Sequence, residues 1–120
     1  MVVDELERLY TKIESSNIFI VLATNAYLES LRDLDREIMT QIQIARQLKK
    51  PFFVVIDSRL SMEDISEINE YFSKDNIIKR VIADMTDPIS AADKVSLEIK
   101  KTMKDMIGSE NRSIDILTGD

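Results

Sequence analysis

Four polar residues follow two short apolar runs of the sequence. Ligands of open parallel sheets bind beyond the carboxyl ends of the strands. Thr24, Asn25 and Ser30 follow the first run, Ile18–Leu22. Asp57 follows the second run, Phe52–Ile56. Free backbone amides at the start of a helix here could hold a phosphate, and the Asp57 carboxylate could contact a sugar hydroxyl. Turns and helix caps use the same residue types. A ligand-binding role and a purely structural role therefore both stay open.

The composition excludes several kinds of chemistry. The chain has no Cys and no His, which removes Cys/His zinc sites, thiol nucleophiles, Ser-His-Asp triads and disulfides. Asp33, Asp35 and Glu37 stand two residues apart in a predicted helix, and side chains at that spacing do not converge on one ion. The sequence therefore predicts no metal site.

Charge and hydropathy limit the partners of the chain. It carries 22 acidic and 16 basic residues, a net charge of −6, and the basic residues are scattered. A nucleic-acid binder needs a basic face, so we expect no nucleic-acid partner. No apolar run approaches the roughly 18 residues of a membrane-spanning helix, and the chain begins with an acidic amphipathic stretch rather than a signal peptide. We expect a cytoplasmic protein that does not enter the membrane.

Two kinds of periodicity define the elements that must position these residues. Apolar residues at helical spacing predict a helix over 3–15. Three runs of β-favouring residues predict strands at 18–22, 52–56 and 77–83. The first two runs are apolar throughout, which is typical of parallel strands covered on both faces.

A long helix is predicted between the first two strands. Ser30 with Asp33 matches a helix-start pattern. In this pattern the hydroxyl accepts a hydrogen bond from the backbone amide three residues later, and the acidic side chain at that later position accepts one from the amide of the hydroxyl residue. Apolar residues at helical spacing then continue to Leu48, which gives a helix of about five turns.

Two further helices have clear start signals. Ser61 with Asp64 repeats the helix-start pattern after the second strand. Asp87 followed by Pro88 is typical of an N-cap residue followed by proline at the first position of a helix. Gly108 is the predicted end of this last helix.

Together these elements predict an α/β fold with the order α-β-α-β-α-β-α. Strands joined by helices form parallel pairs through right-handed connections. We therefore expect a small, mainly parallel three-stranded sheet with helices on both faces, similar to flavodoxin-like folds. The length of 120 residues suits one domain, predicted over residues 1–108, followed by a flexible C-terminal tail over 109–120.

The edges of this sheet differ in character. Lys79 and Arg80 interrupt the third strand, so it is predicted at an edge where charge discourages further pairing. The Ile18–Leu22 edge is apolar, uncharged and free of Pro, and if exposed it would be a template for aggregation. We therefore expect another copy of the chain, as in a homodimer, or a different protein partner to cover this edge or the helix faces.

The segment from Ser16 to Asp57 resembles part of a Toll/interleukin-1 receptor (TIR) domain. The resemblance rests on the run Ser16–Ser30, which contains Asn25 and Tyr27-Leu28, and on Arg36-Glu37-Ile38, Ala45 and Lys50-Pro51. Nucleoside deoxyribosyltransferase-like domains share the helix with Glu, the Ala and the Lys-Pro pair.

The resemblance implies a role for Glu37. In TIR enzymes the matching Glu acts on the ribose of NAD as the nicotinamide bond breaks, where a carboxylate stabilises positive charge developing on the sugar. Two departures from the family matter here. Asp33 stands where the family has Trp, and the first strand, first helix and second strand of the family have no counterpart. The chain would thus keep one wall of the family's ligand crevice.

Three functions follow as alternatives. The first is a TIR-like interaction module in signalling or defence, acting through self-association or a partner. The second is a hydrolase of NAD, or of a nucleoside glycosidic bond, that uses Glu37 and takes its second wall from another subunit. The third is an unrelated doubly wound domain, such as a receiver-like or nucleotide-sensing module.

Overall fold

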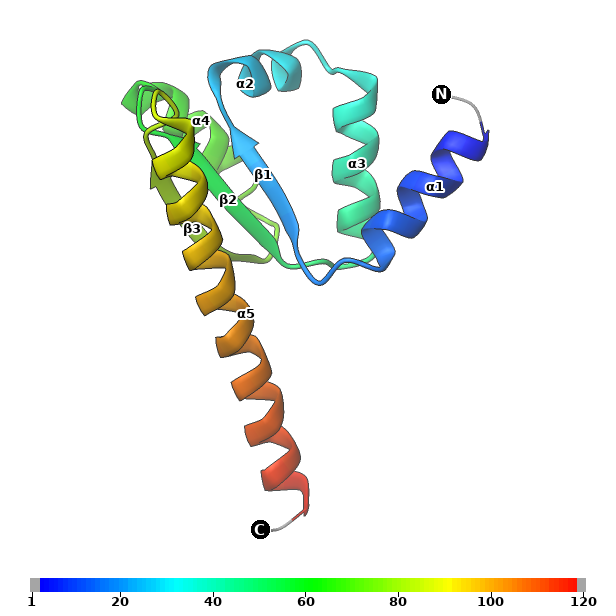
Figure 1. The fold of residues 1–120 in the computed structure, drawn as a ribbon. Helices are drawn as coiled ribbons and strands as arrows, with labels where there is room; N and C mark the ends of the chain where they lie inside the picture. The colour runs from blue at the N-terminus through cyan, green and yellow to red at the C-terminus, as the bar shows by residue number, and fades with distance from the viewer. Residues whose placement is uncertain (1–2, 119–120) are drawn as a thin grey trace.

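The computed structural model describes the backbone of residues 3–118 and the side chains of residues 3–107. In this part the chain forms three strands and five helices (Figure 1). The elements in chain order are α1 (Val3–Glu14), β1 (Phe19–Ala23), α2 (Asn25–Arg32), α3 (Arg36–Gln47), β2 (Phe52–Asp57), α4 (Met62–Tyr71), β3 (Ile77–Ala83) and α5 (Pro88–Thr118).

The three strands form one parallel sheet in the order β1-β2-β3, which confirms the predicted α/β fold. Phe19 of β1 lies opposite Phe52 of β2, and Phe53 lies opposite Lys79 of β3. Both crossovers run in the same direction across the sheet. Because such connections are right-handed, they place α2, α3 and α4 on one face, and α5 returns to cover the other.

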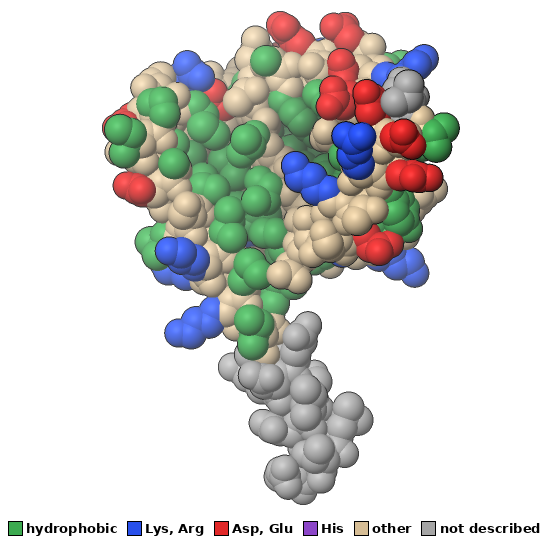
Figure 2. All heavy atoms as spheres, turned by 45° about the vertical axis from the view of Figure 1, so that its right-hand side comes forward, with side chains coloured by type: hydrophobic (Ala, Val, Ile, Leu, Met, Phe, Trp, Pro, Cys, Tyr) green, Lys and Arg blue, Asp and Glu red, His purple; other side chains and the backbone are tan. Residues whose placement is uncertain are grey.

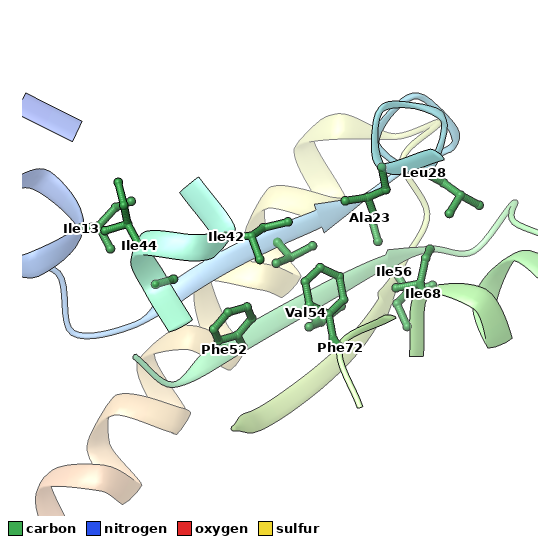
Figure 3. Close-up of a cluster of buried hydrophobic side chains, with 13 residues drawn as sticks. Ile13, Ala23, Leu28, Ile42, Ile44, Phe52, Val54, Ile56, Ile68 and Phe72 are labelled. Atoms are coloured by element: carbon green, nitrogen blue, oxygen red, sulfur yellow. The ribbon is translucent and has the colours of Figure 1, made fainter. Parts of the chain in front are cut away.

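Each face of the sheet has its own apolar core. The larger core joins β1 and β2 to the crossover helices (Figure 3), and its members include Val21, Leu28, Ile42, Phe52, Val54, Ile68 and Phe72. The smaller core lies under α5 and contains Phe53, Val55, Val81, Ala83 and Ala91. All six residues of β2 are buried, as its central position requires.

The long helix predicted from Ser30 to Leu48 is two helices, so the order is α-β-α-α-β-α-β-α. The start predicted at Ser30 is wrong: α2 is capped by Thr24, whose Oγ1 accepts a hydrogen bond from the Tyr27 amide at 3.2 Å. Ser30 lies inside this helix, near its end. Two residue types that both cap helices stand six residues apart, and the earlier one is used.

Leu34 ends the first of these two helices. Its φ of 55° lies in the left-handed region, which no helix interior adopts. Asp35 then caps α3, because its Oδ1 accepts a hydrogen bond from the Ile38 amide at 3.1 Å. Leu34 fits the apolar spacing of the predicted single helix, whereas its side chain is exposed.

The last helix begins where the sequence predicts and ends later. The α5 helix starts at Pro88, and the Asp87 carboxylate accepts a hydrogen bond from the Ser90 amide at 3.3 Å. The predicted end at Gly108 is wrong, because the helix continues to Thr118. A glycine inside a helix costs only about 1 kcal/mol relative to Ala, so it does not by itself stop one. The flexibility of residues 109–120 stays a prediction, since their side chains lie outside the described part.

Candidate functional site

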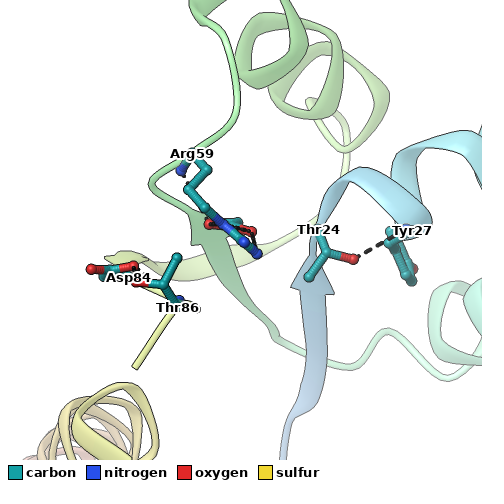
Figure 4. Close-up of polar contacts among 6 residues, drawn as sticks. Thr24, Tyr27, Arg59, Asp84 and Thr86 are labelled. Atoms are coloured by element: carbon teal, nitrogen blue, oxygen red, sulfur yellow. Dashed lines mark hydrogen bonds and ion pairs between the residues drawn. The ribbon is translucent and has the colours of Figure 1, made fainter. Parts of the chain in front are cut away.

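Thr24 and Asp57 lie at the same end of the sheet, as the parallel arrangement predicts. Thr24 follows β1, Asp57 ends β2, and Asp84 follows β3 (Figure 4). This end of the sheet is therefore the first place to look for a ligand site.

The Asp57 carboxylate forms an ion pair and hydrogen bonds with a neighbouring arginine. Asp57 is only 2% exposed. Arg59 donates to Asp57 from Nε to Oδ1 at 3.1 Å, from Nη2 to Oδ2 at 2.8 Å and from its backbone amide at 3.1 Å. These side-chain hydrogen bonds hold the pKa of Asp57 below its usual range. The pair fixes the loop after β2 and leaves the Arg59 guanidinium, rather than the carboxylate, facing solvent.

The other polar residues at this end also serve turns and caps. Asp84 accepts hydrogen bonds from the amide and the hydroxyl of Thr86, which lowers the pKa of Asp84. Thr24 caps α2, and the Asn25 side-chain amide donates to Glu29 Oε1 at 3.4 Å within that helix. A structural role accounts for each of these contacts, and ligand binding by Thr24, Asn25, Ser30 or Asp57 stays a prediction.

Glu37 stands apart from these residues. It lies exposed in the first turn of α3 and borders a shallow hollow with Arg36 and with Glu5 and Leu9 of α1. The lining of that hollow includes neither Thr24 nor Asp57. A carboxylate that stabilises developing charge works best in a site that excludes water, and the exposure of Glu37 does not provide one within this chain. A catalytic role for Glu37 stays a prediction.

The Asp57–Arg59 pair predicts a pH dependence of stability. The pKa of Asp57 is lowered in the folded chain, so the pair stabilises the fold above the unfolded pKa. This stabilisation is lost as the pH falls through the folded pKa. The Asp57→Asn variant should therefore show a flatter loss of stability on acidification, measured by urea unfolding at a series of pH values. Arg59→Met should flatten it as well. An acid slope unchanged in both variants would contradict this assignment.

A second candidate site is the open edge of the sheet at β1. Ile20 and Leu22 are 42% and 53% exposed, although they belong to an apolar strand. The register places them on the same face as Phe53 and Val55, which α5 covers. On that face α5 buries residues of β2 and β3 but none of β1. The predicted apolar edge at Ile18–Leu22 is thus present, and two of its residues, Ile20 and Leu22, have no cover in this chain.

A groove runs along this edge between the strand and α1. Its volume is about 230 Å³, and most of its lining is apolar. The apolar lining includes Leu9 and Ile13 of α1 together with Ile18 and Ile20. Leu22 lies outside this lining, on the same face of the strand as Ile20, and is exposed. We call the groove together with this exposed continuation at Leu22 the β1 groove. In Figure 2, hydrophobic side chains form a continuous band down the middle of the face turned to the viewer.

The opposite edge, at β3, is protected. Lys79 forms an ion pair with Glu98 of α5 at 3.5 Å, and Lys94 Nζ donates to the Ile82 carbonyl at 2.6 Å. Arg80 Nε donates to Asn69 Oδ1 at 3.1 Å. The prediction that β3 is a charged edge strand is confirmed. Charges of this kind prevent edge-to-edge pairing. The β3 edge is therefore protected from pairing with a further strand, and the β1 edge is not.

Comparison with known proteins adds no relative. Neither a protein-family model, nor a curated protein, nor a solved structure matches the chain. The resemblance of residues 16–57 to TIR domains therefore stays a prediction.

Within residues 3–118, no helix combines the length and the apolar character needed to cross a bilayer. Among the side chains of residues 3–107, no group of three or more acidic residues is placed to hold a metal ion.

Proposed function

We propose that this domain is a self-association module whose contact surface is the β1 groove. The observation that carries the proposal is the contrast between the two edges of one sheet. The β3 edge exposes one large apolar residue, Ile82, beside charges that are paired to α5 and α4, whereas the β1 edge exposes Ile20 and Leu22 with no charge between residues 18 and 24. Proteins protect a sheet edge that stays exposed to solvent, for example with charged side chains. The β1 edge lacks such charges, so we expect another chain to cover it.

The topology explains why this surface lacks a cover of its own. One helix packs over about two strands, and α5 lies over β2 and β3. The crossover helices occupy the opposite face because both crossovers have the same hand. The α1 helix, which leads directly into β1, packs against α3 through Ile13 instead of lying beside α5. The α5 side of β1 is therefore short of one neighbouring element.

Leu22→Glu tests the proposal. Removing one buried leucine contact costs about 1.5–3 kcal/mol, which is about tenfold or more in affinity. A symmetric dimer carries the change twice, so its dissociation constant should rise about 100-fold. Leu97→Glu is the matched control: Leu97 is also 53% exposed, but it lies two residues after Val95, on a different side of α5 from the residues that face the sheet.

The measurement is sedimentation velocity over a range of protein concentrations. The native chain and the Leu97→Glu variant should both associate. At the concentrations where they form dimers, Leu22→Glu should remain monomeric. A native chain that is monomeric throughout would overturn the proposal. Equal weakening by Leu22→Glu and Leu97→Glu would also overturn it, because the effect would then come from added charge alone.

A role in signalling or defence is part of the proposal and has the resemblance of Ser16–Asp57 to TIR domains as its only support. A cytoplasmic location is also proposed, and its support is a sequence without Cys, which forms no disulfides. The alternative hydrolase would need a second wall over Glu37, and a partner seated in the β1 groove is one element that could supply it, because Leu9 borders both hollows.

A further inference from the structure

The α1 helix is held on the molecule by few contacts. It packs mainly against α3, and Figure 1 shows it at the margin of the molecule, away from β2 and β3. Ile13 is its one buried residue, and Leu9 is partly buried against the larger core. Elements with few buried apolar contacts open at a smaller cost in free energy than the whole domain. The contacts of α1 therefore favour an opening of this helix alone.

The side of α3 under α1 carries Glu37. Glu37, Gln41 and Ile44 follow one another at four- and three-residue spacing, so they lie on one side of α3. Glu37 borders a hollow with Leu9 of α1. Gln41 lines the β1 groove together with Leu9 and Ile13. Ile44 is buried and lies beside Ile13 (Figure 3). The α1 helix thus covers this side of α3, and Leu9 borders both hollows.

The end of α1 is held by a lysine from the connection between α3 and β2. Lys50 Nζ donates to the Glu14 carbonyl at 2.7 Å and to the Ser16 carbonyl at 2.8 Å. The last carbonyls of a helix have no partner within it, and a cation beside them also interacts favourably with the helix dipole. Glu14 is the last residue of α1, and Ser16 lies in the connection to β1. Lys50 therefore fixes the segment through which α1 is joined to the sheet.

We infer that α1 is a hinged cover on this side of α3, that residues 15–18 are its hinge, and that Lys50 holds it closed. In the closed position α1 divides the hollow beside Glu37 from the β1 groove. When α1 moves away, the two hollows become one open surface along Glu37, Gln41 and Ile44. Short connections that absorb a change in backbone angles serve as hinges in such movements. The cover therefore controls access to the side of α3 that carries Glu37.

Thiol labelling under native conditions tests the opening, because the native chain has no cysteine. Ile44→Cys places a thiol under α1. Ile42→Cys is the matched control, because Ile42 lies on the same helix about 200° around the axis from Ile44 and belongs to the larger core against the sheet (Figure 3). Both isoleucines are buried. The labelling rate is measured in increasing urea below the unfolding transition, at a protein concentration where sedimentation velocity shows monomers.

The slope of the labelling rate with urea reports how much surface each opening exposes. Ile44→Cys should show a shallow slope, because only α1 moves, and Ile42→Cys should show the steep slope of global unfolding. Lys50→Met should speed the labelling of Ile44→Cys about tenfold, because the two hydrogen bonds of the ammonium are lost. Lys49→Met, at the exposed neighbouring position, should leave that rate unchanged.

Three results would overturn the inference. A global slope for Ile44→Cys would mean that α1 opens only with the whole domain. A shallow slope that Lys50→Met leaves unchanged would mean that the reagent reaches residue 44 without an opening that Lys50 opposes. Equal acceleration by Lys50→Met and Lys49→Met would assign the effect to lost charge alone.

Hydrogen exchange of the α1 amides in the native chain measures the same slope without a cysteine, so a variant that fails to fold leaves the inference testable. The inference concerns a single copy of the chain and goes beyond the proposed self-association. A native chain that is monomeric at all concentrations would overturn the association alone, and a global slope for the α1 amides would overturn the hinged cover alone.

Discussion

Replacing Phe52 with alanine should lower the free energy of unfolding by about 3–5 kcal/mol. Phe52 begins the central strand and is almost completely buried. Its ring lies 5.1 Å from the ring of Phe19 and 5.8 Å from the ring of Phe72, so it joins β1 and β2 to the end of α4. Domains have total stabilities of about 5–15 kcal/mol, and the loss would therefore be a large fraction of the whole. Urea unfolding followed by circular dichroism measures it.

Two controls define the cause of this loss. Phe52→Leu keeps most of the buried volume and should lose clearly less stability than Phe52→Ala. Leu34→Ala removes an exposed side chain and should change stability by no more than about 0.5 kcal/mol. A Phe52→Ala variant within about 1 kcal/mol of the native chain would show that the aromatic cluster is not packed as described.

Replacing the next residue, Phe53, should have an effect of similar size but a different distribution. Phe53 points to the opposite face, where only a small core lies between the sheet and α5. Phe53→Ala should again cost about 3–5 kcal/mol if the domain unfolds as one unit. Because α5 rests mainly on this small core, we expect it to detach before the rest of the sheet unfolds.

Native-state hydrogen exchange distinguishes the two phenylalanine variants. In Phe53→Ala the amides of α5 should exchange faster relative to those of α3, whereas in Phe52→Ala the amides of both helices should exchange faster together. Similar acceleration in α3 and α5 for the Phe53 variant would mean that the two cores do not act separately.

The sequence predicts the strands because each is a short run of β-favouring residues with no competing helical pattern. It also predicts the charged edge, since Lys79 and Arg80 have no place in a central strand. It does not predict the break between α2 and α3. Apolar spacing continues through Leu34, and two candidate caps, Thr24 and Ser30, both precede it. Only the packed structure decides that Leu34 takes a left-handed conformation and faces solvent.

The candidate sites were predictable to different degrees. The rule for parallel strands places Thr24 and Asp57 at one end of the sheet, but the return of Arg59 onto Asp57 depends on a local turn that no pattern encodes. The apolar run of β1 indicates a strand covered on both faces. That Ile20 and Leu22 lack such cover follows from the placement of α5 and α1, which spacing along the chain does not determine.

The agreement between strand order and chain order has a consequence for biosynthesis. Each strand pairs with the strand made just before it, so a chain leaving the ribosome can add strands to the growing sheet without waiting for distant segments. The face that carries Phe53 and Val55 gains its cover only when the 31 residues of α5, which follow β3, have emerged. A translational pause between β3 and α5 would leave that face open to neighbouring nascent chains, and codon choice over this short interval therefore bears on the yield of the folded protein.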